Sequence, residues 1–374
     1  MRILFWSELF WPYIGGVELS GTALLTALRP RGYDFIVVTA HDYLDLPDED
    51  RHEGIQVFRL PFRKVLAQRR LDQVSEVRKR LSAIKRAFAP ELVHVNSSGP
   101  SILFFLETAQ VSPAPLVVTL RSGLGNTTLE RDTIMGRVLR RSSWVTSVSA
   151  SLLNDVQRQV SDIIGKSSVV PDGVQMAADR FPEPLSMEAP RVLCLGRLVT
   201  DKGFDLALTA FASIRDRFPN ARLILAGDGP ARGSLERQAA GLNLTGSVTF
   251  LGIVSPARVA ELLHSASLVL MPSRREGLPR VALEAALMAR PVVAARVGGL
   301  GEIIRHGETG WLIDPEDTGG LVKAAISVLE DPDAAARMGR NARNWVQTTF
   351  SWERCVDAYD RLYQKLGKSV SAVA

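Results

Sequence analysis

Two glutamates with seven residues between them, Glu276 and Glu284, bracket a predicted helix start. Residues 267–272 have the length and apolar character of a short buried parallel strand. Pro279 suits the first position of the following helix because its fixed φ matches helical geometry. Glu276 is therefore expected in the turn after the strand and Glu284 on the helix.

The start of this predicted helix has the properties of an anion site. The N–H groups of Leu278, Arg280 and Val281 should lack helical acceptors, and the positive end of the helix dipole favours a phosphate there. Carboxylates aimed at a phosphate would repel it, so we interpret the two glutamates as acceptors for hydroxyl groups. A glycosyl nucleotide carries phosphates, a sugar and a ribose, and it would satisfy all three features.

Two cations upstream could act on the same ligand. Arg197 is predicted at the end of an apolar strand over residues 191–198, and Lys202 in the loop that follows. Open α/β sheets bind ligands at this carboxyl edge. Transfer from a nucleotide sugar releases a diphosphate whose charge grows as the bond breaks, and cations stabilise that charge without a metal. The alternative is a pair of solvated surface cations.

A glycine pair near the chain start is a further candidate. Residues 2–6 predict a first strand and residues 17–29 a helix, with Gly15 and Gly16 between them. Glycine lets a backbone approach a phosphate closely. An ordinary turn is the competing interpretation.

Taken together, these motifs resemble those of the retaining glycosyltransferases of family four, which have the GT-B fold. The resemblance runs along nearly the whole chain and rests on segments that follow in the family's order: 15–18, 195–204, 272–284, 291–302 and 307–312. It implies that Glu276 contacts the donor sugar and Glu284 the nucleotide ribose. It further implies that Arg197 and Lys202 hold the diphosphate, and that Gly15 and Gly16 touch the diphosphate or sugar.

The chain departs from the family pattern at one position. The family has a histidine after the strand that corresponds to residues 115–120, whereas this chain has Arg121. Arginine stays protonated, so a general-base role does not carry over. Arg121 is a candidate for contact with an anionic acceptor or with the sugar. His94, at the end of another predicted strand, is a second candidate, with a structural histidine as the alternative.

Strand and helix patterns alternate along the chain, which favours parallel doubly wound sheets. The predicted class is α/β, with two Rossmann-like domains that face each other across a cleft, as in GT-B proteins. We expect an acceptor domain over residues 1–184 and a nucleotide-sugar domain over 185–351, with a proline-rich linker at the boundary. The resemblance implies that a final helix over 352–374 crosses back to the first domain.

Composition limits the class of protein. The chain has 374 residues, 46% of them hydrophobic, and a net charge of +5. Much of the positive charge lies in residues 61–90, so nucleic-acid binding is not expected. That segment predicts a basic amphipathic helix. Either its apolar face packs in the core and its charges are solvated, or its basic face approaches an anionic membrane. The absence of a signal-peptide pattern and of a long apolar run predicts a cytoplasmic protein, which would be peripheral on the inner face of the membrane if the basic helix contacts it.

The expected activity is therefore metal-independent hexosyl transfer, with retention, from a nucleoside-diphosphate sugar to a hydroxyl of a glycan or lipid-linked acceptor. The expected setting is surface polysaccharide or lipopolysaccharide assembly, and no cofactor is expected. The acidic run over residues 48–50 is interpreted as a solvated turn and not as a metal site. A UDP-N-acetylglucosamine 2-epimerase and a non-catalytic sugar-nucleotide binder remain as alternatives.

Overall fold

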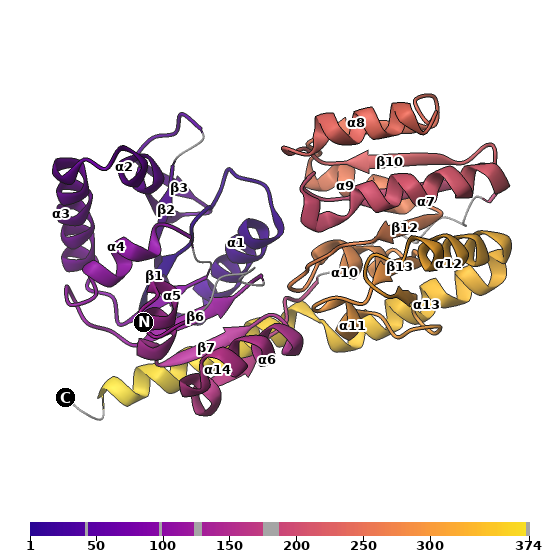
Figure 1. Cartoon of the computed structure of the whole chain (residues 1–374). Helices are drawn as coiled ribbons and strands as arrows, with labels where there is room; N and C mark the ends of the chain where they lie inside the picture. The colour runs from indigo at the N-terminus through magenta and orange to yellow at the C-terminus, as the bar shows by residue number, and fades with distance from the viewer. Residues whose placement is uncertain (42–43, 97–98, 123–128, 175–186, 372–374) are drawn as a thin grey trace. The chain divides into compact units, whose positions relative to one another are not determined.

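The computed structural model describes residues 1–41, 44–96, 99–122, 129–174 and 187–371. The chain forms two compact units (Figure 1). The first comprises Met1–Pro171 and Glu353–Ala374, and the second comprises Asp172–Trp352. The boundary expected after residue 184 lies outside the described residues. No helix among those described is long and apolar enough to cross a membrane.

The first unit is built on an eight-stranded sheet with the order β3-β4-β2-β1-β5-β6-β7-β8. The strands are β1 (Arg2–Trp6), β2 (Asp34–Ala40), β3 (Glu49–His52), β4 (Ile55–Leu60), β5 (Leu92–Val95), β6 (Leu116–Leu120), β7 (Trp144–Ser147) and β8 (Ser167–Val169). Pairing is parallel except between β3 and β4. Apolar residues fill the central strands, as expected for a sheet covered on both faces.

The antiparallel edge strand corrects the prediction of a solvated turn at residues 48–50. Asp50 lies in β3, and its carboxylate is 3.1 Å from the guanidinium of Arg59 on β4. The Arg59 side chain is fully buried and also donates to the carbonyl oxygens of Pro47 and Trp11. The acidic run is therefore held to the sheet by a buried cation, because a buried charge requires partners.

Helices flank this sheet, and the basic segment forms two of them instead of one. The helices are α1 (Gly16–Leu28), α2 (Phe62–Gln68), α3 (Leu71–Phe88), α4 (Ile102–Glu107), α5 (Ile134–Arg141) and α6 (Ala150–Gln159), with 3-10 turns at Arg29–Arg31 and Ser161–Lys166. The break between α2 and α3 falls at Arg69, which caps α2 with a left-handed φ of 52°. The left-handed residue ends α2 and redirects the chain.

The last helix, α14 (Trp352–Ser371), packs on the first unit. Its Tyr359 and Tyr363 are fully buried, and both reach polar side chains of the sheet. Arg31 and Tyr33 bind Asp360 on the same helix. The helix at the end of the chain (yellow in Figure 1) is thus fastened to β5 and β6 of the first unit and to residues that precede β2.

The second unit has a six-stranded, fully parallel sheet with the order β11-β10-β9-β12-β13-β14. Its strands are β9 (Arg191–Leu195), β10 (Arg222–Ala226), β11 (Val248–Gly252), β12 (Leu268–Met271), β13 (Val292–Ala295) and β14 (Trp311–Ile313). Successive strands are added on one side of β9 as far as β11 and then on its other side from β12 to β14, so the strand order reverses between β9 and β12. Such a switch point is where open α/β sheets bind ligands, beyond the carboxyl ends of the strands.

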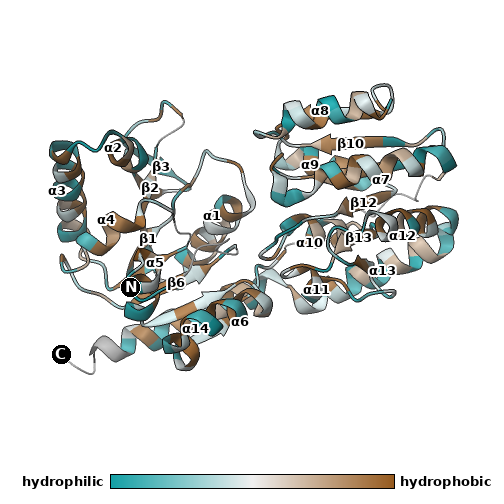
Figure 2. Ribbon diagram, in the orientation of Figure 1, coloured by the Kyte–Doolittle hydropathy of each residue, from teal (hydrophilic) through white to brown (hydrophobic). Residues whose placement is uncertain are grey.

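Two helical layers cover the second sheet. The helices are α7 (Phe204–Arg217), α8 (Arg232–Gly241), α9 (Pro256–Ser265), α10 (Arg280–Leu287), α11 (Leu300–Ile303), α12 (Thr318–Glu330) and α13 (Pro332–Thr349), with a 3-10 turn at Thr200–Lys202. Helices α7 and α12 pack together, as do α10 and α13 (Figure 1). These helices carry apolar and polar residues on different faces (Figure 2), and the apolar faces bury a continuous core against the sheet.

Candidate functional site

The loops after the strands of the second unit meet at the carboxyl edge of its sheet. Strand β9 ends at Leu195, so the predicted strand over 191–198 was too long. Gly196 follows with a φ of +150°, and the chain enters the 3-10 turn Thr200–Lys202, which Gly203 ends with a φ of +65°. These two glycines adopt backbone conformations that other residues avoid, and they present Lys202 at the sheet edge.

Lys202 and Glu276 form the central contact of this edge. The Lys202 ammonium donates to both carboxylate oxygens of Glu276, at 2.7 and 2.8 Å. The Ser273 hydroxyl donates to one of the same oxygens at 2.8 Å. The Glu276 side chain is only 6% exposed, while that of Lys202 is 26% exposed. A buried carboxylate is thus neutralised by a cation that remains accessible.

Arg274 connects the two loops that carry this pair. Its guanidinium forms two hydrogen bonds of 2.7 Å with the carboxylate of Asp205, the second residue of α7. It also donates to the Thr200 carbonyl at 2.8 Å and pairs with Glu316 at 2.6 Å. The hydrogen bonds from Arg274 lower the pKa of Asp205. Bidentate arginine pairs fix orientation as well as charge, so Arg274 sets the spacing of the two loops.

Close backbone contacts also hold the loop of Glu276 in place. The Gly299 N–H donates to the Gly277 carbonyl at 2.8 Å. Gly298 has a φ of +50°, and a Cβ at this position would overlap the Glu276 carbonyl oxygen. A Cβ at Gly203 would likewise overlap the carbonyl oxygen of Pro272. Glycine is required at Gly298 and Gly203 both for backbone conformation and for space.

Helix α10 begins beside these loops. Pro279 is its N-cap and Arg280 its first residue, one position later than the sequence indicated. Leu278 is buried, while Arg280 and Val281 belong to the first turn, whose N–H groups have no acceptor within the helix. The arrangement provides backbone donors and a positive dipole end next to the Lys202–Glu276 pair.

Glu284 lies one turn further along α10. Arg280 contacts it within the helix, with 3.0 Å between a guanidinium nitrogen and the carboxylate. Burial raises the pKa of Glu284, and the charge and hydrogen bonds of Arg280 act in the opposite direction. Both side chains are about one quarter exposed, at 24% and 26%. The Glu284 carboxylate is therefore an accessible acceptor on a rigid element.

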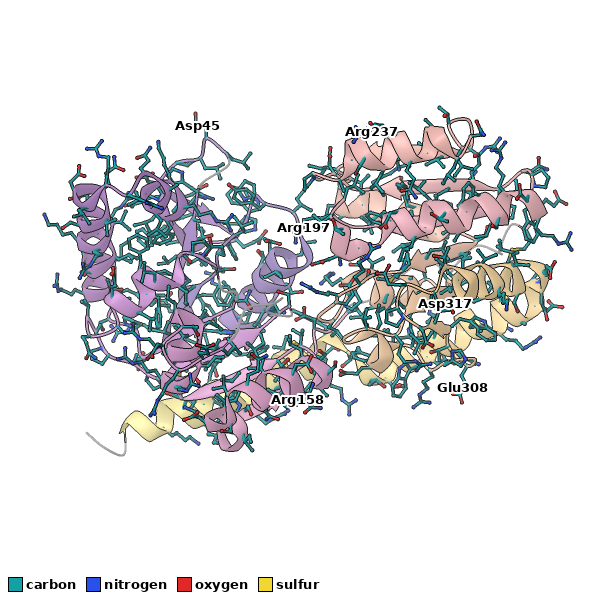
Figure 3. The ribbon with its side chains drawn as sticks, viewed as in Figure 1. Asp45, Arg158, Arg197, Arg237, Glu308 and Asp317 are labelled. Atoms are coloured by element: carbon teal, nitrogen blue, oxygen red, sulfur yellow. The ribbon has the colours of Figure 1, made fainter. Side chains whose placement is uncertain are left out.

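Arg197 follows β9 in the loop, where its side chain is exposed at the carboxyl edge of the sheet (Figure 3). It lies on the same β9–α7 connection as Lys202. The structure thus brings Arg197, Lys202, Glu276, Leu278, Arg280, Val281 and Glu284 to one edge of one unit.

The remaining predicted residues belong to the first unit. Gly15 is the N-cap of α1 in an extended conformation, and Gly16 is the first residue of that helix. A Cβ at Gly15 would meet the Glu18 carboxylate. Arg121 follows β6, and two of its guanidinium nitrogens donate to the Asn96 side-chain oxygen at 3.0 and 2.6 Å.

His94 has the surroundings of a structural histidine. Its side chain is fully buried in β5, and its ring nitrogens lie 2.5 Å from the Tyr363 hydroxyl and 2.7 Å from the Thr119 hydroxyl. Burial and the nearby Arg121 charge lower its pKa to about 3. This placement agrees with the alternative interpretation of His94 as a structural histidine. Its ring is not exposed for contact with an acceptor.

Sequence reasoning missed three contributors to the site: Ser273, Asp205 and Arg274. Ser273 and Arg274 belong to the same segment as the two glutamates. Their residue types alone do not identify which neighbours they bind. Asp205 follows the Lys-Gly pair closely, and only the fold shows that it faces Arg274.

Comparison with known proteins identifies the family. Residues 14–177 match the family model described as Glycosyltransferase Family 4, and residues 175–345 match that of Glycosyl transferases group 1. A glycogen synthase of Mycobacterium tuberculosis is 28% identical over 397 aligned residues, which cover 97% of this chain and 94% of that protein.

Solved structures show the same fold. Sucrose-phosphate synthase from Thermosynechococcus elongatus superposes with a TM-score of 0.85 at 23% identity, over 99% of this chain and 100% of that one. Anabaena HepE, determined in complex with UDP and glucose, has a TM-score of 0.77 at 22% identity, over 98% and 100% of the two chains. The expected GT-B class of two parallel-sheet α/β domains is confirmed. With two family models that together span residues 14–345, the chain belongs to the group 1 glycosyltransferases of family four, which have the GT-B fold and use nucleotide-sugar donors.

Proposed function

We propose that the protein transfers a hexosyl group, with retention of anomeric configuration and without a metal ion, from a nucleoside-diphosphate sugar to a hydroxyl group. The observation that carries the proposal is the accessible ammonium of Lys202, held against the buried carboxylate of Glu276 beside the start of α10. Phosphate oxygens of a donor can replace Glu276 as partners of this cation. The carboxylate is then available to a sugar hydroxyl.

Charge development explains the roles of these residues. As the bond between the sugar and the diphosphate breaks, negative charge grows on the leaving oxygen. Lys202 and Arg197 would neutralise it, and the N–H groups at the start of α10 would hold the phosphates. Glu276 would position the sugar and Glu284 the ribose. The two basic side chains would supply the charge compensation that a metal ion provides in other transferases, which supports a metal-independent reaction. Retention rests on the resemblance to retaining enzymes.

We further propose that the acceptor is a glycan or lipid-linked hydroxyl compound in surface polysaccharide or lipopolysaccharide assembly. The α2–α3 corner supports a membrane-bound acceptor. Leu71 is 83% exposed there and follows the exposed Arg69 and Arg70. An apolar side chain next to cations suits the surface of an anionic membrane. The protein would then act as a peripheral protein on the cytoplasmic face.

The corner is a better place to test membrane contact than the middle of α3. Arg78 and Arg80 in α3 pair with acidic residues of the same unit, so charge reversal there would disturb the fold. Replacing Arg69 and Arg70 by glutamate and Leu71 by serine should abolish sedimentation with anionic vesicles. Vesicles of neutral lipid, which wild type should not bind, provide the control. Undiminished sedimentation of the triple variant would refute the membrane proposal.

A donor screen tests the central reaction. The protein is incubated with UDP-, GDP- and ADP-hexoses, with and without glycan or lipid-linked acceptors, and nucleoside diphosphate and sugar products are measured. Acceptor-dependent release of nucleoside diphosphate, with an α-linked product from an α-linked donor, supports the proposal. Conversion of the donor to its isomer without acceptor indicates an epimerase. Donor binding without release under any condition indicates a non-catalytic binder, and activity abolished by a chelator contradicts metal independence.

A further inference from the structure

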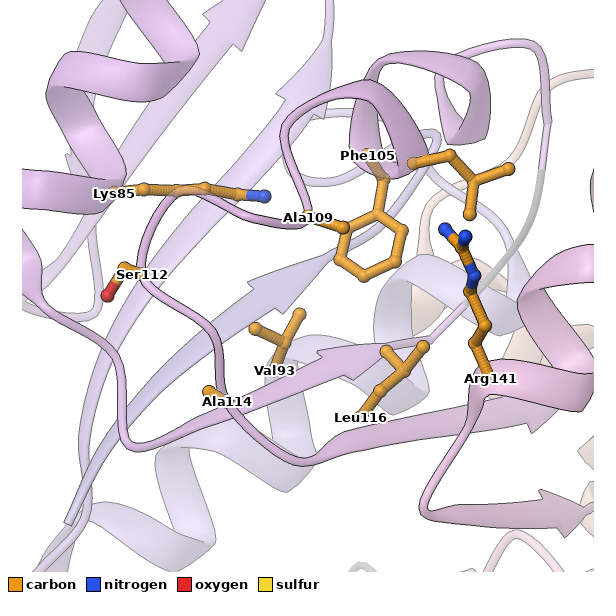
Figure 4. Close-up of a pocket in the computed structure, with 9 residues that line it drawn as sticks. Lys85, Val93, Phe105, Ala109, Ser112, Ala114, Leu116 and Arg141 are labelled. Atoms are coloured by element: carbon orange, nitrogen blue, oxygen red, sulfur yellow. The ribbon is translucent and has the colours of Figure 1, made fainter.

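A separate cavity lies in the first unit, on the side of the sheet opposite to His94. Its volume is about 100 Å³, and its lining includes Val93 and Leu116 (Figure 4). These two residues are register partners near the amino ends of β5 and β6. Asn96 and Arg121 follow the other ends of the same strands, so the cavity is at the edge away from Arg121, the candidate for contact with the sugar or acceptor. Because neighbours on a strand point to opposite faces, Val93 and His94 face different layers.

The inner wall of the cavity carries a buried cation, Lys85 of α3. Its side chain is 2% exposed. The ammonium donates to the carbonyl and hydroxyl oxygens of Thr108, each at 2.9 Å, and lies 4.9 Å from the Phe105 ring centre. Among the described residues these oxygens satisfy two of its three N–H groups. No carboxylate of the described residues forms an ion pair with it, and burial alone lowers its pKa to about 8.

A second cation lies on the solvent side. Arg141 is the last residue of α5, lines the cavity and is exposed. In Figure 4 its side chain and that of Lys85 lie on opposite sides of the Phe105 ring. Apart from Ser112 the rest of the lining is aliphatic or aromatic, and Val93, Phe105, Leu106 and Leu116 are buried. The cavity therefore combines positive charge with apolar walls, and no negative group among its lining residues compensates the charge.

We propose that this cavity binds a short-chain carboxylate, which accepts a hydrogen bond from Lys85 and packs its alkyl group against Val93, Phe105 and Leu116. Arg141 attracts the anion from the solvent side. A carboxylate fits because one charge-assisted bond satisfies the remaining ammonium donor, while the apolar wall favours an alkyl chain over water. A phosphate ion has no alkyl group to pack against the apolar wall, although Ser112 and Arg141 in the lining could donate to its oxygens.

The size of the cavity limits the ligand. An apolar cavity of ~150 Å³ holds benzene, so a volume of about 100 Å³ suits an acid of roughly four carbons or fewer. Butyrate is therefore the probe. This inference does not depend on sugar transfer, because its residues are not among the proposed donor or acceptor contacts.

The test is a titration of the intact protein with butyrate at pH 7, followed by ligand-observed NMR. Butan-1-ol controls for the alkyl chain, and inorganic phosphate controls for the charge. Lys85→Met should weaken butyrate binding by at least about tenfold, because it removes a charged donor of similar shape. Lys79→Met, which replaces an exposed lysine on the same helix, should leave binding unchanged. Ala114→Leu keeps Lys85 but fills the cavity, and it should also weaken binding by about tenfold or more.

The proposal is overturned if wild type does not bind butyrate, or if either Lys85→Met or Ala114→Leu, in folded form, binds it as well as wild type does. Equal affinity for butan-1-ol would show that the cation has no role. Phosphate binding as tight as that of butyrate would show a simple anion site. If Lys85→Met does not fold, the outcome for Ala114→Leu decides.

Discussion

The Lys202 ammonium lies 2.7 and 2.8 Å from the two carboxylate oxygens of Glu276, so each neutralises the other when no donor is bound. A nucleoside diphosphate that approaches Lys202 must compete with this carboxylate. In the proposed reaction, the pair would therefore couple donor binding to the release of Glu276 toward the sugar.

This competition predicts opposite effects of one substitution on binding and turnover. Glu276→Gln removes the negative charge, so the affinity for nucleoside diphosphate should rise by about threefold because repulsion is lost. The kcat for sugar transfer should fall by at least about tenfold, since the sugar loses a charged acceptor. Calorimetry and a diphosphate-release assay measure the two effects. Glu330→Gln, at an exposed ion pair of the same unit, is the control and should change neither. Weaker diphosphate binding in Glu276→Gln would contradict the competition.

Arg274 should act as a positioning residue. Arg274→Ala removes its bonds to Asp205, Glu316 and the Thr200 carbonyl, and should destabilise the second unit by about 1–3 kcal/mol. We expect kcat/KM to fall by more than the loss of folded protein at the assay temperature can explain, because the two loops lose their spacing. Arg217→Ala breaks an exposed pair with Glu330 and serves as control. Normal kcat/KM in folded Arg274→Ala would refute this role.

Two nearby glycines should respond differently to alanine. Gly298→Ala forces a left-handed φ and a clash with the Glu276 carbonyl, which should cost about 1–3 kcal/mol. Gly301→Ala in α11 meets open space and should be neutral or slightly stabilising, because alanine favours helix. Thermal unfolding measures both. A melting temperature for Gly298→Ala equal to that of wild type would show that the loop relaxes freely.

Burial of neutral His94 predicts a pH dependence of stability. The pKa is lowered to about 3 in the folded protein, against about 6.5 in the unfolded chain. Between these values the unfolded state binds more protons, so stability falls as pH falls below about 6.5. His94→Gln should lose less stability than wild type between pH 7 and pH 5, by about 2 kcal/mol. Denaturant unfolding at both pH values measures this, and identical losses in the two proteins would exclude the His94 contribution.

Parts of this molecule were predictable because they depend on local pattern. The strand over Arg2–Trp6 and the helix of Glu284 follow from apolar runs and a proline. The edge strand with Asp50 was not predictable, because it depends on buried Arg59 nine residues away in sequence. The break of the basic helix at Arg69 rests on a left-handed residue that is not a glycine. The Arg274–Asp205 contact spans 69 residues, and no local signal encodes it.

The most direct test of the account is diphosphate binding by Lys202. Isothermal titration of wild type with UDP, GDP and ADP should give binding of at least one nucleotide. Lys202→Met should weaken that binding by at least about tenfold, because a charge-assisted contact to phosphate is lost. Lys323→Met, at an exposed lysine of α12 in the same unit, should bind as wild type does. Failure of wild type to bind any of the three, or equal affinity in Lys202→Met, would contradict the proposed site.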